Sequence, residues 1–119
     1  MPTVAVDFDG VIHRYSRGWD DGTIYDPPLE GAVEGLRALM LDFAVFVHTT
    51  RSPVAVAVWL REQGLDARPD VPGDPDPPEF WRFRGVLLVT NRKLPAVAYI
   101  DDRAIKFESW AQTLREVLW

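Results

Sequence analysis

Residues Thr3-Val-Ala-Val-Asp7-Phe8-Asp9-Gly10 form an apolar run that ends in two carboxylates and a glycine. A short apolar run of this kind is typical of a strand buried in a parallel sheet. Asp-Gly is a common turn pair, so the chain is expected to turn sharply after this strand. The sequence therefore predicts a buried strand that presents acidic side chains at its carboxyl end.

Strands and helices are predicted to alternate along the rest of the chain. Apolar residues at helical spacing predict helices over 29–41 and 107–118, and Ser52, Pro53 and Gly64 mark the cap, first turn and end of another. Further short apolar runs predict strands over 43–47, 86–89 and 96–100, and the proline-rich 68–78 segment is predicted to be a surface loop. We therefore expect an α/β fold: a three-layer α/β/α sandwich with a mostly parallel central sheet, Rossmann-like.

Composition limits the classes of protein that this chain can represent. Its 119 residues predict a single domain, 1–119, and the absence of cysteine excludes disulfide scaffolds, thiolate metal sites and cysteine nucleophiles. The net charge of −5 argues against nonspecific nucleic-acid binding. No apolar run is long enough to span a membrane and no leader pattern follows Met1, so we expect a cytoplasmic protein without membrane partners.

Four of the predicted strands end in chemically active residues. These sets are Asp7 with Asp9, His48 to Arg51, Thr90 to Lys93, and Asp101 to Arg103. In a parallel sheet they meet at one edge, where ligands bind. Clustered carboxylates need a cation, and hard oxygen ligands without His or Cys select Mg²⁺. A lysine and threonine hydroxyls beside that cation suit an anion, so the sequence indicates phosphoryl chemistry.

At these residues the sequence resembles the haloacid dehalogenase-like phosphatase superfamily. The resemblance is carried by Asp7-Phe8-Asp9-Gly10-Val11, Thr49, Lys93 and Asp101-Asp102, in the family's order, and it spans about residues 3–110. It implies an Mg²⁺-dependent phosphomonoester hydrolase that acts on a small-molecule phosphate ester. The 10–48 and 50–92 intervals are too short for the cap domain that the family usually carries, so we expect a capless member.

The resemblance also implies a role for each motif residue. Asp7 would be the nucleophile that becomes an aspartyl phosphate, and Asp9 would be the general acid and base. Thr49, helped by the Thr50 amide, would bind the phosphoryl group, and Lys93 would bridge Asp7 and the phosphate. Mg²⁺ would be held by Asp7, the Asp9 carbonyl, Asp101 and Asp102, and Gly10 would permit the turn. Arg51 follows the Thr pair, and we expect it either to bind substrate or to stabilise its loop.

Two other functions stay open at this point. One is a receiver-like signalling domain, although the order of its acidic residues and lysine differs from the order here. The other is a non-catalytic module that binds phosphate esters. The identity of the ester, the oligomeric state and the roles of His13, Arg14 and Arg17, which lie in a predicted flap, are not read from the sequence.

Overall fold

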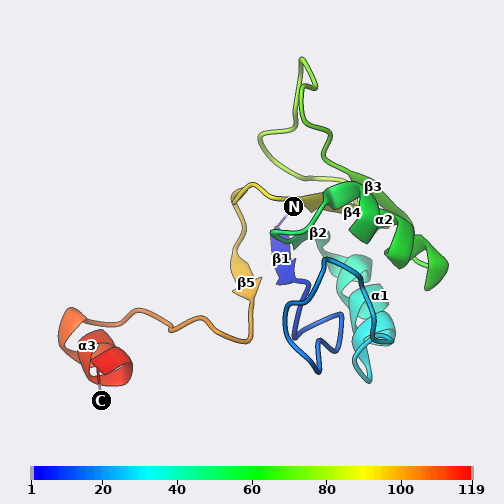
Figure 1. Cartoon of the computed structure of the whole chain (residues 1–119). Coiled ribbons are helices and arrows are strands. Elements are labelled where there is room, and N and C mark those ends of the chain that lie inside the picture. Colours follow the sequence, from blue (N-terminus) through cyan, green and yellow to red (C-terminus); the bar gives the residue numbers. More distant parts are fainter. Residues whose placement is uncertain (1, 119) are drawn as a thin grey trace.

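The computed structural model describes residues 2–118, which form an α/β fold with a parallel sheet (Figure 1). The elements in chain order are β1 (Thr3–Asp7), α1 (Ala32–Asp42), β2 (Ala44–His48), α2 (Pro53–Glu62), β3 (Ala67–Pro69), β4 (Leu87–Thr90), β5 (Ala98–Ile100) and α3 (Trp110–Leu118). The predicted α/β class and parallel sheet are confirmed. The predicted strands are present, with ends that differ by one or two residues.

The five strands are arranged in the order β3-β4-β2-β1-β5, and every neighbouring pair is parallel. In β1, Asp7 pairs with His48 of β2, and Val6 pairs with Ile100 of β5. The strand ends that carry the acidic and hydroxyl side chains therefore lie at the same edge of the sheet. This register is what brings residues about 90 positions apart in the sequence to one place.

Both faces of the sheet are covered by apolar side chains, but by different kinds of structure. On one face, α1 and α2 pack Leu36, Val56 and Leu60 against the sheet. On the other face, Trp81 and Leu94 from the long connections around β4 cover the sheet. Trp81 is anchored by its indole N–H, which donates to the Val86 carbonyl at 3.1 Å. Loop segments thus form the layer opposite α1 and α2.

The starts of the two packed helices follow from local hydrogen bonding. Ser52 caps α2, because its hydroxyl accepts from the Ala55 N–H at 3.3 Å, and Pro53 is its first residue, as predicted. Helix α1 was predicted from residue 29 but begins at Ala32. The Leu29 N–H instead donates to the Ile12 carbonyl at 2.7 Å, so this part of the chain is held against the turn after β1.

The proline-rich segment contributes one short strand that was not predicted. Strand β3 lies at the edge of the sheet, where a proline costs no ladder hydrogen bond on its free side. Arg61 of α2 donates from Nε to the Ala67 carbonyl at 2.7 Å and holds this strand near the helix. The rest of the segment is loop, as predicted.

The last helix forms as predicted but begins at Trp110 rather than at residue 107. The Ser109 hydroxyl accepts from the Gln112 N–H at 3.2 Å and caps it. The helix buries none of its described residues, and Trp110 is 70% exposed. Figure 1 shows α3 standing apart from the sheet at the end of an extended segment. None of the described helices is long and apolar enough to span a membrane.

Candidate functional site

A pocket of about 280 Å³ lies at the carboxyl ends of β1, β2 and β5. Its lining includes five of the predicted site residues: Asp7, Asp9, Thr49, Thr50 and Asp101. His48, Tyr15 and Arg103 complete the lining. Asp7 ends β1, Thr49 and Thr50 follow β2, and Asp101 follows β5, so the parallel register alone explains why they meet.

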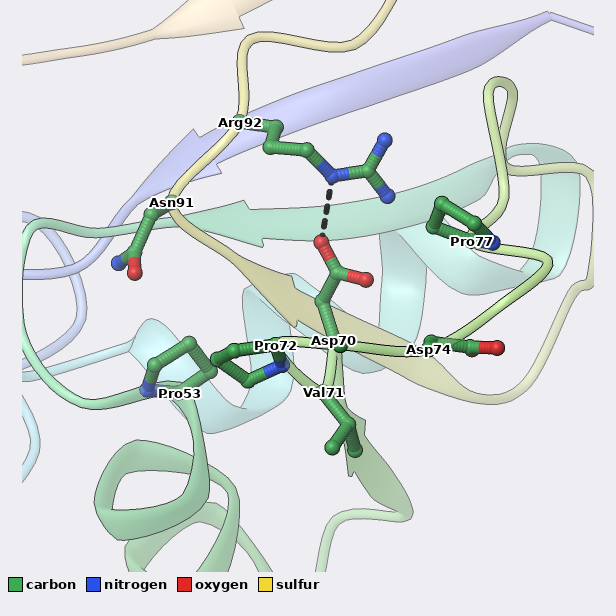
Figure 2. A pocket seen from close by; sticks show the side chains of 9 residues that line it. Pro53, Asp70, Val71, Pro72, Asp74, Pro77, Asn91 and Arg92 are labelled. Carbon is green, nitrogen blue, oxygen red and sulfur yellow. Dashed lines mark hydrogen bonds and ion pairs between the residues drawn. The ribbon is translucent and has the colours of Figure 1, made fainter.

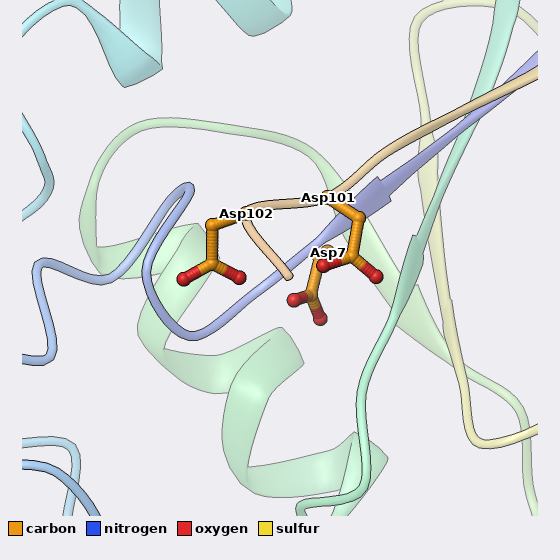
Figure 3. Close-up of side chains that lie close together, drawn as sticks. All are labelled: Asp7, Asp101 and Asp102. Carbon is orange, nitrogen blue, oxygen red and sulfur yellow. The ribbon is translucent and has the colours of Figure 1, made fainter. Parts of the chain in front are cut away.

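Three carboxylates form a tight cluster beside this pocket. Asp7, Asp101 and Asp102 each offer an oxygen, and these oxygens lie within 4.8 Å of one another (Figure 3). Burial raises the pKa of Asp7 to about 6, and the neighbouring Asp101 and Asp102 charges act in the same direction. The hydrogen bond from the Phe8 N–H to Asp7 Oδ1, at 2.9 Å, opposes this rise only in part. Repulsion among three ionised carboxylates at this spacing destabilises the fold. The arrangement suits a hard divalent cation, for which carboxylate oxygens are the preferred ligands.

Gly10 is required by the same cluster. Its φ is +84°, and a Cβ built on it would lie 2.2 Å from Oδ2 of Asp102. A side chain at this turn would therefore displace the exposed Asp102 carboxylate from its present position. Gly10 was predicted for the turn, and the structure adds that it also makes space for an acidic side chain.

Asp9, which is not part of the three-carboxylate cluster, is held by two side chains. Arg51 Nε lies 3.0 and 2.9 Å from its two oxygens, and His13 Nδ1 lies 2.8 Å from Oδ1. Both partners approach as donors to a carboxylate, which makes these charge-assisted bonds. The backbone after β1 forms a tight turn in which the Phe8 carbonyl accepts from the Ile12 and His13 N–H groups. Asp9 is therefore fixed by its turn and by both partners.

Arg51 connects the loop after β2 to the flap, which we define as residues 14–28. Its side chain is 3% exposed, and its Nη1 donates to the Gly22 carbonyl at 2.8 Å. The guanidinium lies 4.9 Å from the ring centre of Trp19 and 5.7 Å from that of Tyr15. Of the two roles expected for Arg51, these contacts support stabilisation of the loops around the site.

His13 is part of the framework rather than of the pocket surface. It is fully buried, and its Nε2 accepts from the Asp26 N–H at 3.1 Å while Nδ1 faces Asp9. Arg14 is exposed, and Arg17 lies with its guanidinium 4.1 Å from the Tyr25 ring centre. None of these three basic residues lines the pocket.

Asn91, which directly follows β4, holds the loop after β2 in place. The sequence had not singled this residue out. Asn91 Nδ2 donates to the carbonyls of Thr49 and Arg51, at 2.5 and 2.9 Å. Thr49 itself is buried, and its Oγ1 accepts from the Arg51 N–H at 3.1 Å. The only sequence signal for Asn91 was its place directly after a predicted strand.

Lys93 is the one predicted catalytic residue that is not in the lining of the pocket. Its Nζ lies 5.4 Å from the centre of the Tyr99 ring. Over residues 2–118 no ion pair joins Lys93 to Asp7. The bridge that the resemblance implied between these two residues is thus not formed in this structure.

A second pocket, also of about 280 Å³, lies between the proline-rich loop and the start of α2 (Figure 2). Asp70 Oδ2 is 2.7 Å from both Arg92 Nε and Thr90 Oγ1. Burial alone would raise the pKa of Asp70, but the hydrogen bonds from Arg92 and Thr90 hold it below its usual range. Arg92 also donates from Nη2 to the Pro78 carbonyl at 2.7 Å, so this ion pair fastens the loop to β4.

The chain matches no protein-family model, and comparisons with curated proteins and with solved structures give no match.

Proposed function

We propose that this chain is an Mg²⁺-dependent phosphomonoester hydrolase that acts through an aspartyl phosphate on Asp7. One observation carries the proposal: Asp7, Asp101 and Asp102 offer oxygens within 4.8 Å of one another, beside a pocket that is also lined by Asp9 and Thr49. The resemblance to haloacid dehalogenase-like phosphatases, drawn from the order of the motifs, is consistent with this arrangement.

Asp7, Asp101 and Asp102 would hold the cation, with the Asp9 carbonyl as a further ligand. Bound there, Mg²⁺ would supply positive charge that offsets the repulsion among the acids and the incoming phosphate. The same acids without a cation would repel a phosphate ester, so binding of substrate depends on that charge.

In the first half of the reaction, an Asp7 oxygen attacks phosphorus and the bond from phosphorus to the ester oxygen breaks. Asp9, which accepts from Arg51 and His13 in this structure, would have to release one of these partners and take up a proton before it gives that proton to the leaving oxygen. In the second half, Asp9 takes a proton from water, the water oxygen attacks phosphorus, and the bond to Asp7 breaks to release inorganic phosphate. Thr49 and the Thr50 amide would bind the phosphoryl oxygens at the pocket wall.

The test is release of inorganic phosphate from a panel of phosphomonoesters with Mg²⁺, comparing wild type with Asp7→Asn. Asp66→Asn is the matched control, because Asp66 is exposed and lies outside the pocket. We expect activity in wild type and the control, loss of activity on adding a chelator, and no activity in Asp7→Asn. Equal phosphate release by wild type and Asp7→Asn would reject the proposal.

One observation favours the alternative of a non-catalytic module that binds phosphate esters: Lys93 lies over Tyr99 and not at Asp7. Such a module would bind esters in the presence of Mg²⁺ without turnover. Calorimetric titration with the same panel distinguishes the two functions, since a hydrolase consumes the ester and a binding module returns it unchanged.

A further inference from the structure

Helix α3 presents an apolar face that, within residues 2–118, only the Phe107 ring contacts, edge-on against Trp110 with 5.4 Å between ring centres. Trp110, Leu114, Val117 and Leu118 recur at helical spacing and are between 49% and 71% exposed. Gln112 and Glu116 lie on the opposite face, where their side chains hydrogen-bond at 3.1 Å. A nine-residue helix in water is marginal by itself, so its stability depends on packing of that apolar face.

The body of the same chain carries an uncovered apolar groove. The groove has a volume of about 130 Å³ and runs between α1 and the β1–β5 pair, lined by Val6, Val11, Ala32, Leu36, Leu39 and Ile100. Ile100, at the end of β5, is 41% exposed although its neighbour in the sheet, Val6, is buried. This is the face of the sheet on which α1 packs, and beside β5 it lacks a helix.

The molecule also exposes more surface than a compact chain of its mass. Its accessible surface is 7569 Å², whereas a folded monomer of 13.5 kDa exposes about 6,500 Å². Its radius of gyration is 15.0 Å, against about 13.5 Å for a compact chain of this length. The excess of roughly 1,000 Å² is of the size that docking one amphipathic helix in a groove removes, and two such events give about 2,000 Å², enough for a stable dimer.

Residues 101–109 determine where the helix can dock. Every residue of this segment is exposed, and it leads α3 away from the groove of its own chain (Figure 1). We infer that α3 docks in the α1–β5 groove of a second copy, and that the second copy's α3 fills the groove of the first. A reciprocal exchange of this kind closes with two-fold symmetry and leaves no groove or helix unpaired. The inference does not depend on the proposed function.

Disulfide trapping provides a direct test, because the chain has no cysteine of its own. Leu39→Cys places a thiol in the groove and Val117→Cys places one on α3. The two single variants are mixed, incubated and oxidised. A disulfide between them can form only across copies, and we expect it as the main product. Each variant oxidised alone reports background pairing. If instead the mixture gives none and the double variant forms a disulfide within one chain, α3 docks on its own body and the inference fails.

Molar mass from light scattering gives a second, independent readout. We expect wild type at twice the 13.5 kDa chain mass, Leu114→Asp at the monomer mass, and Gln112→Asp unchanged as a dimer, because Gln112 lies on the polar face. A monomeric wild type across the concentration series would overturn the inference. The trapping experiment stays informative even where Leu114→Asp disturbs folding, since it uses only exposed or half-buried positions.

Discussion

The guanidinium of Arg51 forms an ion pair with the carboxylate of Asp9, and its Nε lies 3.0 and 2.9 Å from the two carboxylate oxygens. The pair joins the loop after β2 to the turn after β1, and the Gly22 carbonyl ties the flap to the same guanidinium at 2.8 Å. Asp9 is the residue that would move protons in the proposed reaction. Its orientation is thus set by a partner 42 positions away in the sequence.

Arg51→Lys should therefore impair the site although the charge is kept. A lysine offers a point charge in place of the planar fork and cannot pair with Asp9 and Gly22 together. We expect faster proteolytic cleavage within residues 14–28, and, in the proposed hydrolase, a fall in kcat of about 100-fold from misplacement of Asp9. Arg14→Lys is the control, since Arg14 is exposed. Unchanged cleavage and turnover in Arg51→Lys would show that this pair does not order the site.

Asp7→Asn should stabilise the cation-free protein while removing its activity. Burial, together with repulsion from Asp101 and Asp102, raises the pKa of Asp7 to about 6 in the folded state. A raised carboxyl pKa means that ionisation costs stability, so wild type loses stability as pH rises from about 4 through 6. Because Asp7 keeps part of its solvent contact, we expect a gain for the variant of about 1–2 kcal/mol.

The measurement for Asp7→Asn is chemical denaturation in a chelator at pH 8 and again at pH 3.5. The advantage of the variant should be present at the higher pH and absent at the lower. Adding Mg²⁺ should raise the stability of wild type more than that of the variant. If Asp7→Asn is less stable than wild type at pH 8 without cation, then burial of Asp7 and repulsion from Asp101 and Asp102 do not destabilise the wild-type fold as we expect.

Gly10→Ala tests the close approach of Asp102. The new Cβ would lie 2.2 Å from the Asp102 carboxylate, and the residue would keep a φ of +84°. Gly73→Ala is the control. It carries the same cost of a left-handed backbone, since Gly73 has φ +85°, but its new Cβ would meet no heavy atom within 4 Å. We expect each variant to lose about 1–2 kcal/mol from the left-handed backbone, and only Gly10→Ala to bind Mg²⁺ more weakly in titration calorimetry. Equal cation affinity in the two variants would show that Asp102 plays no part in binding.

Asp70→Asn should lower stability in a pH-dependent way. Hydrogen bonds from Arg92 and Thr90 outweigh burial and hold the pKa of Asp70 below 3.8. A lowered carboxyl pKa stabilises the fold fully above the unfolded value of 3.8, and this contribution is lost as pH falls through the folded value. We expect a loss of about 1 kcal/mol at pH 7, since Arg92 is partly exposed, and a smaller loss once the pH falls through the folded pKa of Asp70. Thermal melts against Asp66→Asn check this, and a pH-independent difference would contradict it.

Much of the fold was predictable because the strands are short apolar runs bounded by turn residues. Asp7, Thr49 and Asp101 were placed together by a single assumption, that the strands are parallel. The Arg51–Asp9 pair was not predictable, since it depends on how the side chains of two separate loops are oriented. Asn91 likewise has no signal beyond its position. For α3, the pattern indicates that one helix face must be covered, but periodicity carries no information on what covers it.

Ile100 lines the α1–β5 groove and is followed directly by Asp101 and Asp102. Whatever fills that groove also contacts the end of the three-residue edge strand that two of the three acids follow. If α3 of a second copy fills the groove and the three acids hold a cation, self-association and divalent-ion affinity would be linked, and each would change the other by the same factor. In such a protein, dilution would separate the two copies and so weaken ion binding, and a chelator would remove the ion and so weaken the association of the two copies.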